Sequence, residues 1–227
     1  MAVRAARDFT ASTQRPAVLR VRYTFRGVTH EQTLPVSSAS RLLPDCPEPL
    51  FLLNRRDQVH SSFDANPGTL DKLWHSPQDL SAMVFFSADE QNCELIIEVI
   101  DDIHQQPFAA ADIWRGDSVQ FFFFVPGQDA CWQFGMARRD DGTDATWCWG
   151  TPSGSDPNAV SRQLAVTTSR DGSNTRYAVT LPWQALKVNP DIARKGLRFN
   201  LMVNDSDLGV REGWIRIAPG VGSDVSE

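Results

Sequence analysis

Short apolar segments alternate with turn signals along most of this chain, from about residue 48 onward. Gly-containing turns at 66–68, 126–127, 141–142 and 171–172 separate the segments, and helical patterns are confined to 183–186, after Pro182, and to 68–74. Strands of this length and spacing predict an all-β protein, an antiparallel two-sheet β-sandwich. The predicted strands lie near 49–53, 82–87, 94–101, 118–125, 131–138, 144–149, 160–168, 174–181, 197–204 and 213–218.

Every second side chain in four of these segments is apolar, which predicts the face that packs between the two sheets. The opposite parity carries a mixed set, and it is either an ordinary solvated face or the floor of a binding site. The predicted core residues are Leu95, Ile97, Val99, Val119, Phe121, Phe123, Val125, Trp132, Phe134, Met136, Leu197, Phe199, Leu201 and Val203. The mixed set is Gln120, Gln133, Arg198, Asn200 and Met202.

Residues 18–36 form a separate pattern before the main run of strands. Val21, Tyr23 and Phe25 alternate with basic and polar residues, and Gly27 follows, which predicts an antiparallel strand pair. Residues 37–49 are rich in Ser and Pro and are typical of a linker. We therefore divide the chain into residues 1–47, with this N-terminal strand pair and linker, and a β-sandwich at 48–227. The first part is either the tail of a preceding module or an addition that packs against the sandwich.

Charge and composition exclude several classes of partner. The chain has 227 residues and a net charge of −6, so it lacks the clustered cations that nucleic acids require. No segment approaches the roughly 18 apolar residues of a membrane span, and the first residues lack the apolar centre of a signal peptide. The chain is therefore either cytosolic or a piece of a larger secreted protein. Cys131 and Cys148 flank a predicted hairpin, and they either form a disulfide or stay free.

Two connections between strands concentrate polar chemistry. The first contains Trp114 and four carboxylates, Asp101, Asp102, Asp112 and Asp117, and the second contains Asn204, Asp205 and Asp207. Carboxylates and loop carbonyls suit Ca²⁺, which takes six to eight oxygen ligands. The alternative is that these side chains cap turns or form salt bridges to Arg115 and Arg211. Trp114 in a loop is either a stacking platform for the apolar face of a sugar ring or a cap on the end of the core.

The sequence carries no sign of catalysis, so we predict that the protein is not an enzyme. Asp101 and Asp102 are adjacent on a strand and point to opposite faces, which makes them a poor acid–base pair for glycoside hydrolysis. The four histidines are scattered, and zinc, phosphate-loop and dinucleotide motifs are missing.

Several motifs occur together in the order of a known family. They are a Trp-x-x-Asp-Ser-Val strand start at 114–119, a Pro-Trp-x-x-Leu turn at 182–186 and a Val-Asn-Asp-x-Asp corner at 203–207. Over about residues 50–220 the chain resembles a family 9 carbohydrate-binding module of the DOMON-like superfamily. The resemblance implies a sugar-binding β-sandwich with structural calcium, usually appended to secreted polysaccharide-degrading enzymes.

The resemblance also implies where a sugar would bind, between two tryptophans. Trp114 matches the first platform, and Gln120 stands where such modules have Glu. Met202 stands where they have Gln, and either Gln133 or Gly135 stands where they have Arg. The second tryptophan has no clear counterpart in the C-terminal loop, and Trp147 or Trp149 would have to replace it.

Together these observations predict a non-catalytic carbohydrate-binding module of a secreted polysaccharide-processing protein, located outside the cell or on its surface. Its partners would be a polysaccharide or oligosaccharide and the other modules of the same parent chain. The competing hypotheses are a structural or interaction module without a sugar site, and a haem-binding relative that uses Met202 and His104. The predicted sugar contacts are Trp114, Gln120, Gln133, Asp117 and Asn204, and the predicted calcium ligands are Asp101, Asp102, Asp205 and Asp207.

Overall fold

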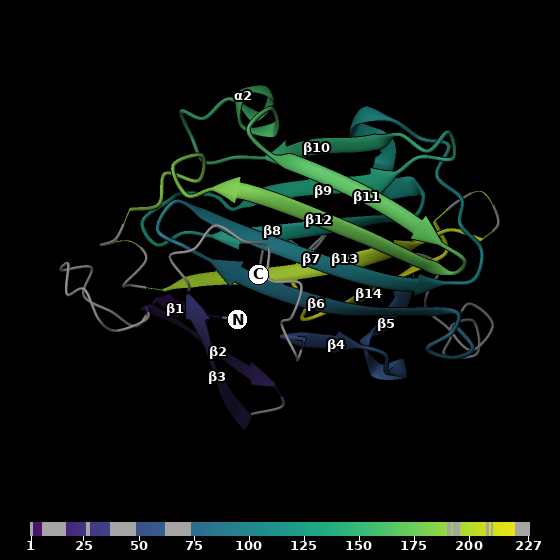
Figure 1. Cartoon of the computed structure of the whole chain (residues 1–227), viewed down its shortest axis with the longest axis horizontal. Helices are drawn as coiled ribbons and strands as arrows, with labels where there is room; N and C mark the ends of the chain where they lie inside the picture. Colours follow the sequence, from purple (N-terminus) through teal and green to yellow (C-terminus); the bar gives the residue numbers. More distant parts are fainter. Residues whose placement is uncertain are drawn as a thin grey trace.

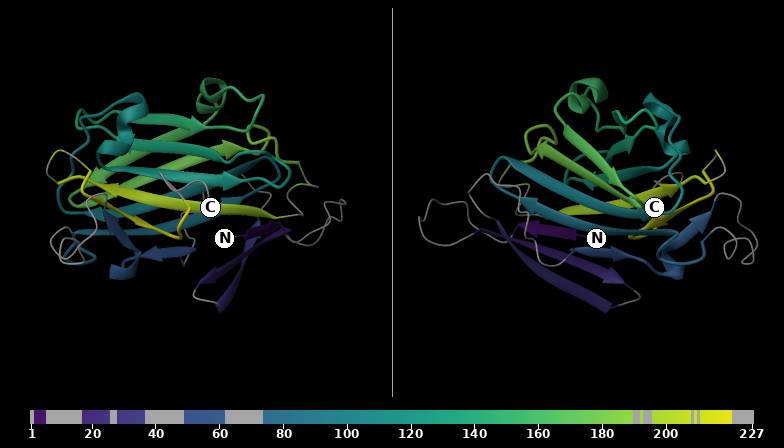
Figure 2. Two further views of the ribbon diagram at one scale, coloured as in Figure 1. Left: turned by 180° about the vertical axis from the view of Figure 1, so that it is seen from behind. Right: turned by 45° about the vertical axis from the view of Figure 1, so that its right-hand side comes forward.

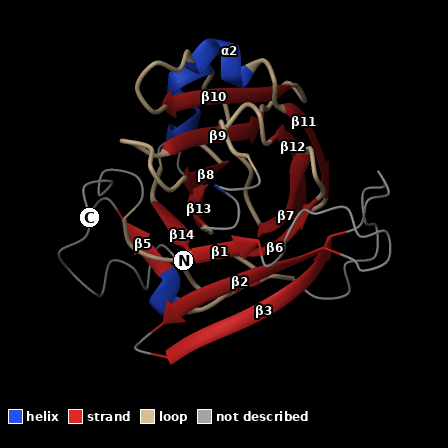
Figure 3. Ribbon diagram, turned by 90° about the vertical axis from the view of Figure 1, so that its left-hand side faces the viewer, coloured by secondary structure: helices blue, strands red, loops and turns tan. Residues whose placement is uncertain are grey.

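The computed structural model of the chain describes residues 2–5, 17–25, 28–36, 49–61, 74–189, 192, 196–207, 209 and 211–220, the first three ranges as backbone only. Two antiparallel sheets pack face to face (Figures 1 and 3), which confirms the predicted sandwich. The smaller sheet has five strands in the order β11 (Ala165–Asp171), β12 (Asn174–Pro182), β7 (Asn92–Asp101), β6 (Leu80–Ala88) and β4 (Phe51–Leu53).

The larger sheet has nine strands and carries the candidate site. Its main path is β10 (Asp144–Gly150), β9 (Trp132–Arg138), β8 (Ser118–Phe124), β13 (Leu197–Asp205), β1 (Ala2–Ala5), β2 (Ala17–Phe25) and β3 (Val28–Val36). Beside this path, β14 (Gly213–Arg216) pairs with β13 and with β5 (Val59–Ser61). The helical segments are short: the 3₁₀ turns η1 (Arg56–Gln58) and η2 (Ala110–Arg115), and the helix α2 (Pro157–Ser161).

The core between the sheets consists of the residues that the alternation predicts. Each of them is buried within one continuous cluster, together with side chains of the smaller sheet such as Tyr177. Aromatic rings from neighbouring strands fill its centre, with Phe121 stacked on Phe134 at 5.2 Å between centroids. Burial of this apolar surface is the main favourable contribution to folding, at roughly 25 cal/mol per Å².

The N-terminal strand pair is confirmed, and it extends the larger sheet. β2 and β3 are antiparallel, with Phe25 opposite Val28, and β1 joins them to β13 through the pairing of Val3 with Leu197. Figure 2 shows β1 beside the start of β13, with β2 and β3 farther out. Residues 37–48 of the predicted linker lie outside the described residues, and the division of the chain at residue 47 stays a prediction.

Three elements differ from the predicted ones. The strand expected at 160–168 begins only at Ala165, because Asp156 accepts a hydrogen bond from the Asn158 amide (2.9 Å) and Pro157 begins α2. The segment 183–186 is a hydrogen-bonded turn and not a helix, with Ala185 N donating to Pro182 O at 3.0 Å. The segment expected to be helical at 68–74 lies outside the described residues except for Trp74.

The outer face of the larger sheet is the face that points away from the smaller sheet. The interpretation of this face as ordinarily solvated is wrong for Gln120, Asn200 and Met202, which are buried. Met202 is buried because it belongs to a second apolar cluster, in which Phe122, Cys131 and Met202 pack with Phe124 and Trp214. Cys131 belongs to this cluster, whereas Cys148 belongs to the core between the sheets, and both thiols are free.

Among the described residues, none of the helices has the length and apolar character needed to cross a membrane.

Candidate functional site

An acidic corner forms where one strand of each sheet ends. Asp101 is the last residue of β7 in the smaller sheet, and Asp205 is the last residue of β13 in the larger sheet. The carboxylate oxygens of Asp101, Asp205 and Asp207 lie within 4.8 Å of one another. Those of Asp79, Asp102 and Asp207 form a second group within the same distance. The fold therefore brings together all four carboxylates that the sequence suggests as metal ligands, and adds Asp79.

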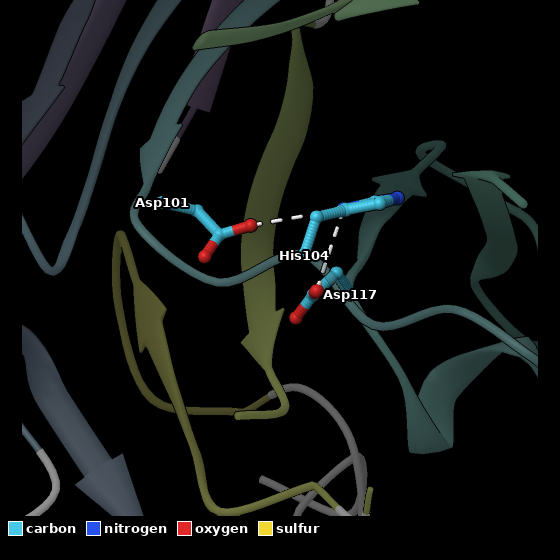
Figure 4. A group of neighbouring side chains, drawn as sticks. All are labelled: Asp101, His104 and Asp117. Atoms are coloured by element: carbon cyan, nitrogen blue, oxygen red, sulfur yellow. Dashed lines mark ion pairs between the residues drawn. The ribbon is translucent and has the colours of Figure 1, made fainter. Parts of the chain in front are cut away.

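Asp117 ties the two connections of this corner together. Its Oδ1 accepts a hydrogen bond from Ser206 N at 2.8 Å, and its Oδ2 accepts one from Gln105 N. His104 lies beside it, with Nδ1 3.4 Å from Asp117 Oδ2 and 3.7 Å from Asp101 Oδ2 (Figure 4). The Asp117 carboxylate is thus buried against protein donors, away from any sugar in solvent.

The corner holds more negative charge than its neighbours balance. Arg170 Nη1 lies 3.2 Å from Asp101 Oδ2 and forms an ion pair with it. Burial, with the Asp207 charge second, raises the pKa of Asp205 to about 9, and burial together with the Asp101 charge raises the pKa of Asp207 to about 7. The pKa of Asp117 is also well above its ordinary value, because the side chain is buried near Asp101.

The donor set fits a hard cation. The two groups of aspartates described above offer only carboxylate oxygens, which are the ligands that Ca²⁺ prefers. A bound cation would also offset the cost of burying carboxylates without a counter-charge. Asp207 Oδ1 is buried and makes no hydrogen bond within the described part of the chain. The corner is therefore a set of acidic groups able to hold a metal ion.

Trp114 lies in η2, at the edge of the outer face, and its side chain is 36% exposed. The Arg211 guanidinium lies over this ring, 4.8 Å from its centroid, and also over Trp214 at 4.5 Å. Arg211 Nη1 donates to Asn204 Oδ1 at 3.2 Å, and Asn204 Nδ2 donates to Ser118 Oγ at 2.9 Å. Asn204 is therefore buried and bonded to protein on both sides of its amide.

η2 owes its position to a buried amide that the sequence did not single out. Gln106 is fully buried, and its Nε2 donates to the carbonyls of Ile113 (2.9 Å) and Asp117 (2.8 Å). A Cβ at Gly116 would lie 2.7 Å from the Gln106 side chain, so only glycine lets the loop close over it. A polar residue in a loop gives no sequence signal for this role.

Gln120 and Gln133 are neighbours on the outer face, with Gln133 Nε2 3.5 Å from Gln120 Oε1. Beside them, the Trp149 ring fills the space over Gly135, where a Cβ would lie 2.3 Å from the indole. Trp149 Nε1 donates to Ala111 O in η2 at 2.9 Å. An indole therefore covers Gly135, one of the two positions for which the resemblance implies an arginine.

Asp79, Gln106 and the stacking of Arg211 on two tryptophans are parts of this region that no sequence motif indicates. The haem hypothesis gains no support, because His104 directs Nε2 to Arg138 O at 2.9 Å and Nδ1 to carboxylates.

The region just described belongs to an antiparallel β-sandwich with an acidic corner and a tryptophan at the edge of one sheet. No family model matches the sequence, and no curated protein matches it. Among solved structures, the fold is similar to that of a family 9 carbohydrate-binding module from Caldicellulosiruptor kristjanssonii in complex with glucose, with a TM-score of 0.45 and 15% identity over 63% of this chain and 69% of that one. The same module in complex with cellotriose gives a TM-score of 0.45 and 16% identity over 63% and 68% of the two chains. At this identity the likeness concerns the fold alone.

Proposed function

We propose that this chain is a non-catalytic carbohydrate-binding module. The observation that carries the proposal is Trp114, a partly exposed indole in η2, the turn that precedes β8. An aromatic ring of this kind can stack on the apolar face of a pyranose. The order of the sequence motifs around Trp114 agrees with this function.

The acidic corner would hold a structural Ca²⁺ in this function, with Asp101, Asp102, Asp205 and Asp207 as ligands and Asp79 as a further one. The cation would supply the positive charge that the buried carboxylates lack. It would also fix the loop that carries Trp114, because Asp117 bonds both connections of the corner.

The setting of the module follows from the same proposal. Its ligand would be a polysaccharide or an oligosaccharide, and the parent chain would be a secreted polysaccharide-processing protein with further modules. The module would therefore work outside the cell or at its surface.

The experiment is a calorimetric titration of the calcium-loaded chain with glucose, cellotriose, xylobiose and a short β-1,3-glucan. We expect heat from at least one sugar, and a smaller heat for Trp114→Ala because the stacking surface is lost. Leu52→Ala is the matched control, since Leu52 is an exposed apolar side chain (49%) on the smaller sheet. If Trp114→Ala titrates like the unmodified chain, Trp114 is not a sugar platform.

A structural or interaction module is the second candidate, and one observation favours it. Arg211 covers part of Trp114, so the ring is stacked on a side chain of the protein before any sugar arrives. Under this alternative neither the unmodified chain nor Arg211→Ala binds any sugar of the panel. Sugar binding that strengthens in Arg211→Ala would instead mean that Arg211 competes with a sugar for the indole.

A further inference from the structure

A pocket opens on the outer face at the end of the strands remote from Trp114. Its volume is about 490 Å³, and it lies between the last residues of β8, the loop after it, and the start of β9 and β13. Trp114 precedes β8, whereas Phe124 is the last residue of that strand, so the strand length separates the two places. Pockets for small molecules have volumes of roughly 300–1,000 Å³. The pocket is therefore large enough for a small ligand and distinct from the Trp114 region.

The lining combines one aromatic ring with planar polar groups. Phe124 forms an apolar wall, and the Arg198 guanidinium lies 4.9 Å from its centroid. The amide of Gln133 and the carboxylate of Asp129 line the same pocket, and Asp129 Oδ1 is oriented by a hydrogen bond from Ser153 N at 3.0 Å. A guanidinium, a carboxylate and an amide each present two polar atoms in one plane, which matches pairs of adjacent hydroxyls.

The charges of the lining favour a neutral ligand. One cation, Arg198, and one anion, Asp129, lie among the lining residues, so their fields oppose each other. An anionic ligand would meet the carboxylate and a cationic ligand would meet the guanidinium. A neutral polyhydroxylated ring can donate to Asp129 and accept from Arg198 at once.

Gly150 keeps the pocket open. A Cβ at this position would lie 3.4 Å from Gln133 Cβ and 3.6 Å from Gln133 Oε1, which is ordinary contact. The position needs no left-handed backbone, because Gly150 is not among the residues of positive φ. A larger side chain can therefore be placed here without backbone strain, and it would occupy space beside the Gln133 amide.

We propose that this pocket binds one ring of a neutral sugar, as a second site that works independently of Trp114. The inference rests on the proposed function, because it assumes that the chain binds carbohydrate. It assigns Gln133 to the pocket, and it adds Phe124, Asp129 and Arg198 as contacts.

The test compares three variants by calorimetry with the same sugar panel, after circular dichroism has shown that each one folds. We expect Gly150→Leu to abolish binding at the pocket and Gln133→Ala to weaken it about fivefold, the effect of losing one hydrogen bond. Trp114→Ala should change the dissociation constant of the pocket by less than about twofold, because the length of β8 separates Trp114 from the pocket. Gln184→Ala is the matched control, because Gln184 is exposed in the turn after β12.

A second measurement reports on the pocket directly. In amide NMR spectra, the Gly150 signal, identified by its loss in Gly150→Leu, should shift on addition of sugar to both the unmodified chain and Trp114→Ala. If Gly150→Leu folds and binds sugar like the unmodified chain, the pocket proposal is overturned while the proposed function stands. If the unmodified chain gives neither heat nor shifts with any sugar, the proposed function fails, and the pocket proposal fails with it.

Discussion

Gly135 lets the Trp149 indole lie against the larger sheet, and a single methyl group there tests how much this contact matters. In Gly135→Ala the added Cβ would lie 2.3 Å from the indole, so Trp149 must move and lose its hydrogen bond to Ala111 O. We expect a loss of about 1–3 kcal/mol in the free energy of unfolding, the usual cost of overpacking. Urea denaturation followed by circular dichroism measures this loss.

The control is a double-mutant cycle with Trp149→Ala. Once the indole is removed, Gly135→Ala has nothing to displace, so its cost should fall well below the cost in the unmodified background. Equal costs in the two backgrounds would show that the strain comes from the backbone and not from Trp149.

Single residues divide into those that the sequence predicts and those that only the fold reveals. The buried residues of the core, such as Phe121 and Phe199, follow from strand alternation, because side-chain direction has a period of two. The contact of Arg211 with Trp114 joins separate segments, and no local pattern links an arginine to a ring 97 positions before it. The burial of Gln120 likewise depends on what lies over the sheet and not on the strand itself.

At the scale of elements, η2 is a 3₁₀ segment held by one buried side chain. Gln106→Glu would replace the amide that donates to Ile113 O and Asp117 O with an oxygen that repels both carbonyls. We expect a loss of about 2–4 kcal/mol in stability, since buried donors and acceptors are costly when they lose their partners. Thermal denaturation measures it, and Gln184→Glu, the same change at an exposed position in the turn after β12, is the comparison.

The same substitution tests whether the position of η2 affects sugar binding, because Gln106 holds η2 but touches no sugar. If the proposed function is correct, Gln106→Glu should weaken sugar binding at Trp114 although Gln106 touches no ligand. Unchanged stability in Gln106→Glu would mean that other contacts hold η2.

Most strands are predictable from sequence, because alternation and turn residues act locally. The errors lie at short or irregular elements. The α2 helix has only five residues, and its last two, Val160 and Ser161, fall inside the segment 160–168, which the sequence predicts to be a strand. β5 has three residues and depends on pairing with β14, a contact that its own sequence does not encode.

At the scale of the whole molecule, the acidic corner joins the two sheets, and its charge should govern stability. In the cation-free protein Asp205 keeps its proton up to about pH 9, whereas an ordinary aspartate releases it near 3.8. Between these values the folded state binds more protons than the unfolded state, so stability falls as the pH rises. We expect the melting temperature in a chelator to be lower at about pH 8 than at about pH 5, by scanning calorimetry.

Calcium should reverse this dependence. A cation that binds only the folded state adds about 2.7 kcal/mol at a concentration one hundred times its dissociation constant, and it binds deprotonated carboxylates. The rise in melting temperature on adding Ca²⁺ should therefore be larger at about pH 8 than at about pH 5. Asp205→Asn should remove most of the rise, and Asp171→Asn, at an exposed strand end, should not. An equal rise in both variants would place the cation elsewhere.

The corner itself was partly predictable. The sequence indicates two acidic connections, and the sandwich places them together because β7 and β13 end at the same side of the molecule. Asp79 lies in the turn before β6 and completes the corner. Aspartate is common in turns because its side chain bonds the nearby backbone, so its presence there does not indicate a metal ligand. Asp117 and Asn204, which the sequence analysis predicts as sugar contacts, both have protein partners in the folded chain.

The hydrogen bonds of the acidic corner connect residues that are remote along the chain: Gln105 with Asp207, 102 positions apart, and Asp117 with Ser206, 89 positions apart. Contacts of such separation close long loops, and their entropic cost is paid before they contribute any stability. This end of the sandwich can therefore assemble only after most of the strands between the two connections are in place. A cation bound there would act late in folding, and mainly by slowing the opening of a structure that has already formed.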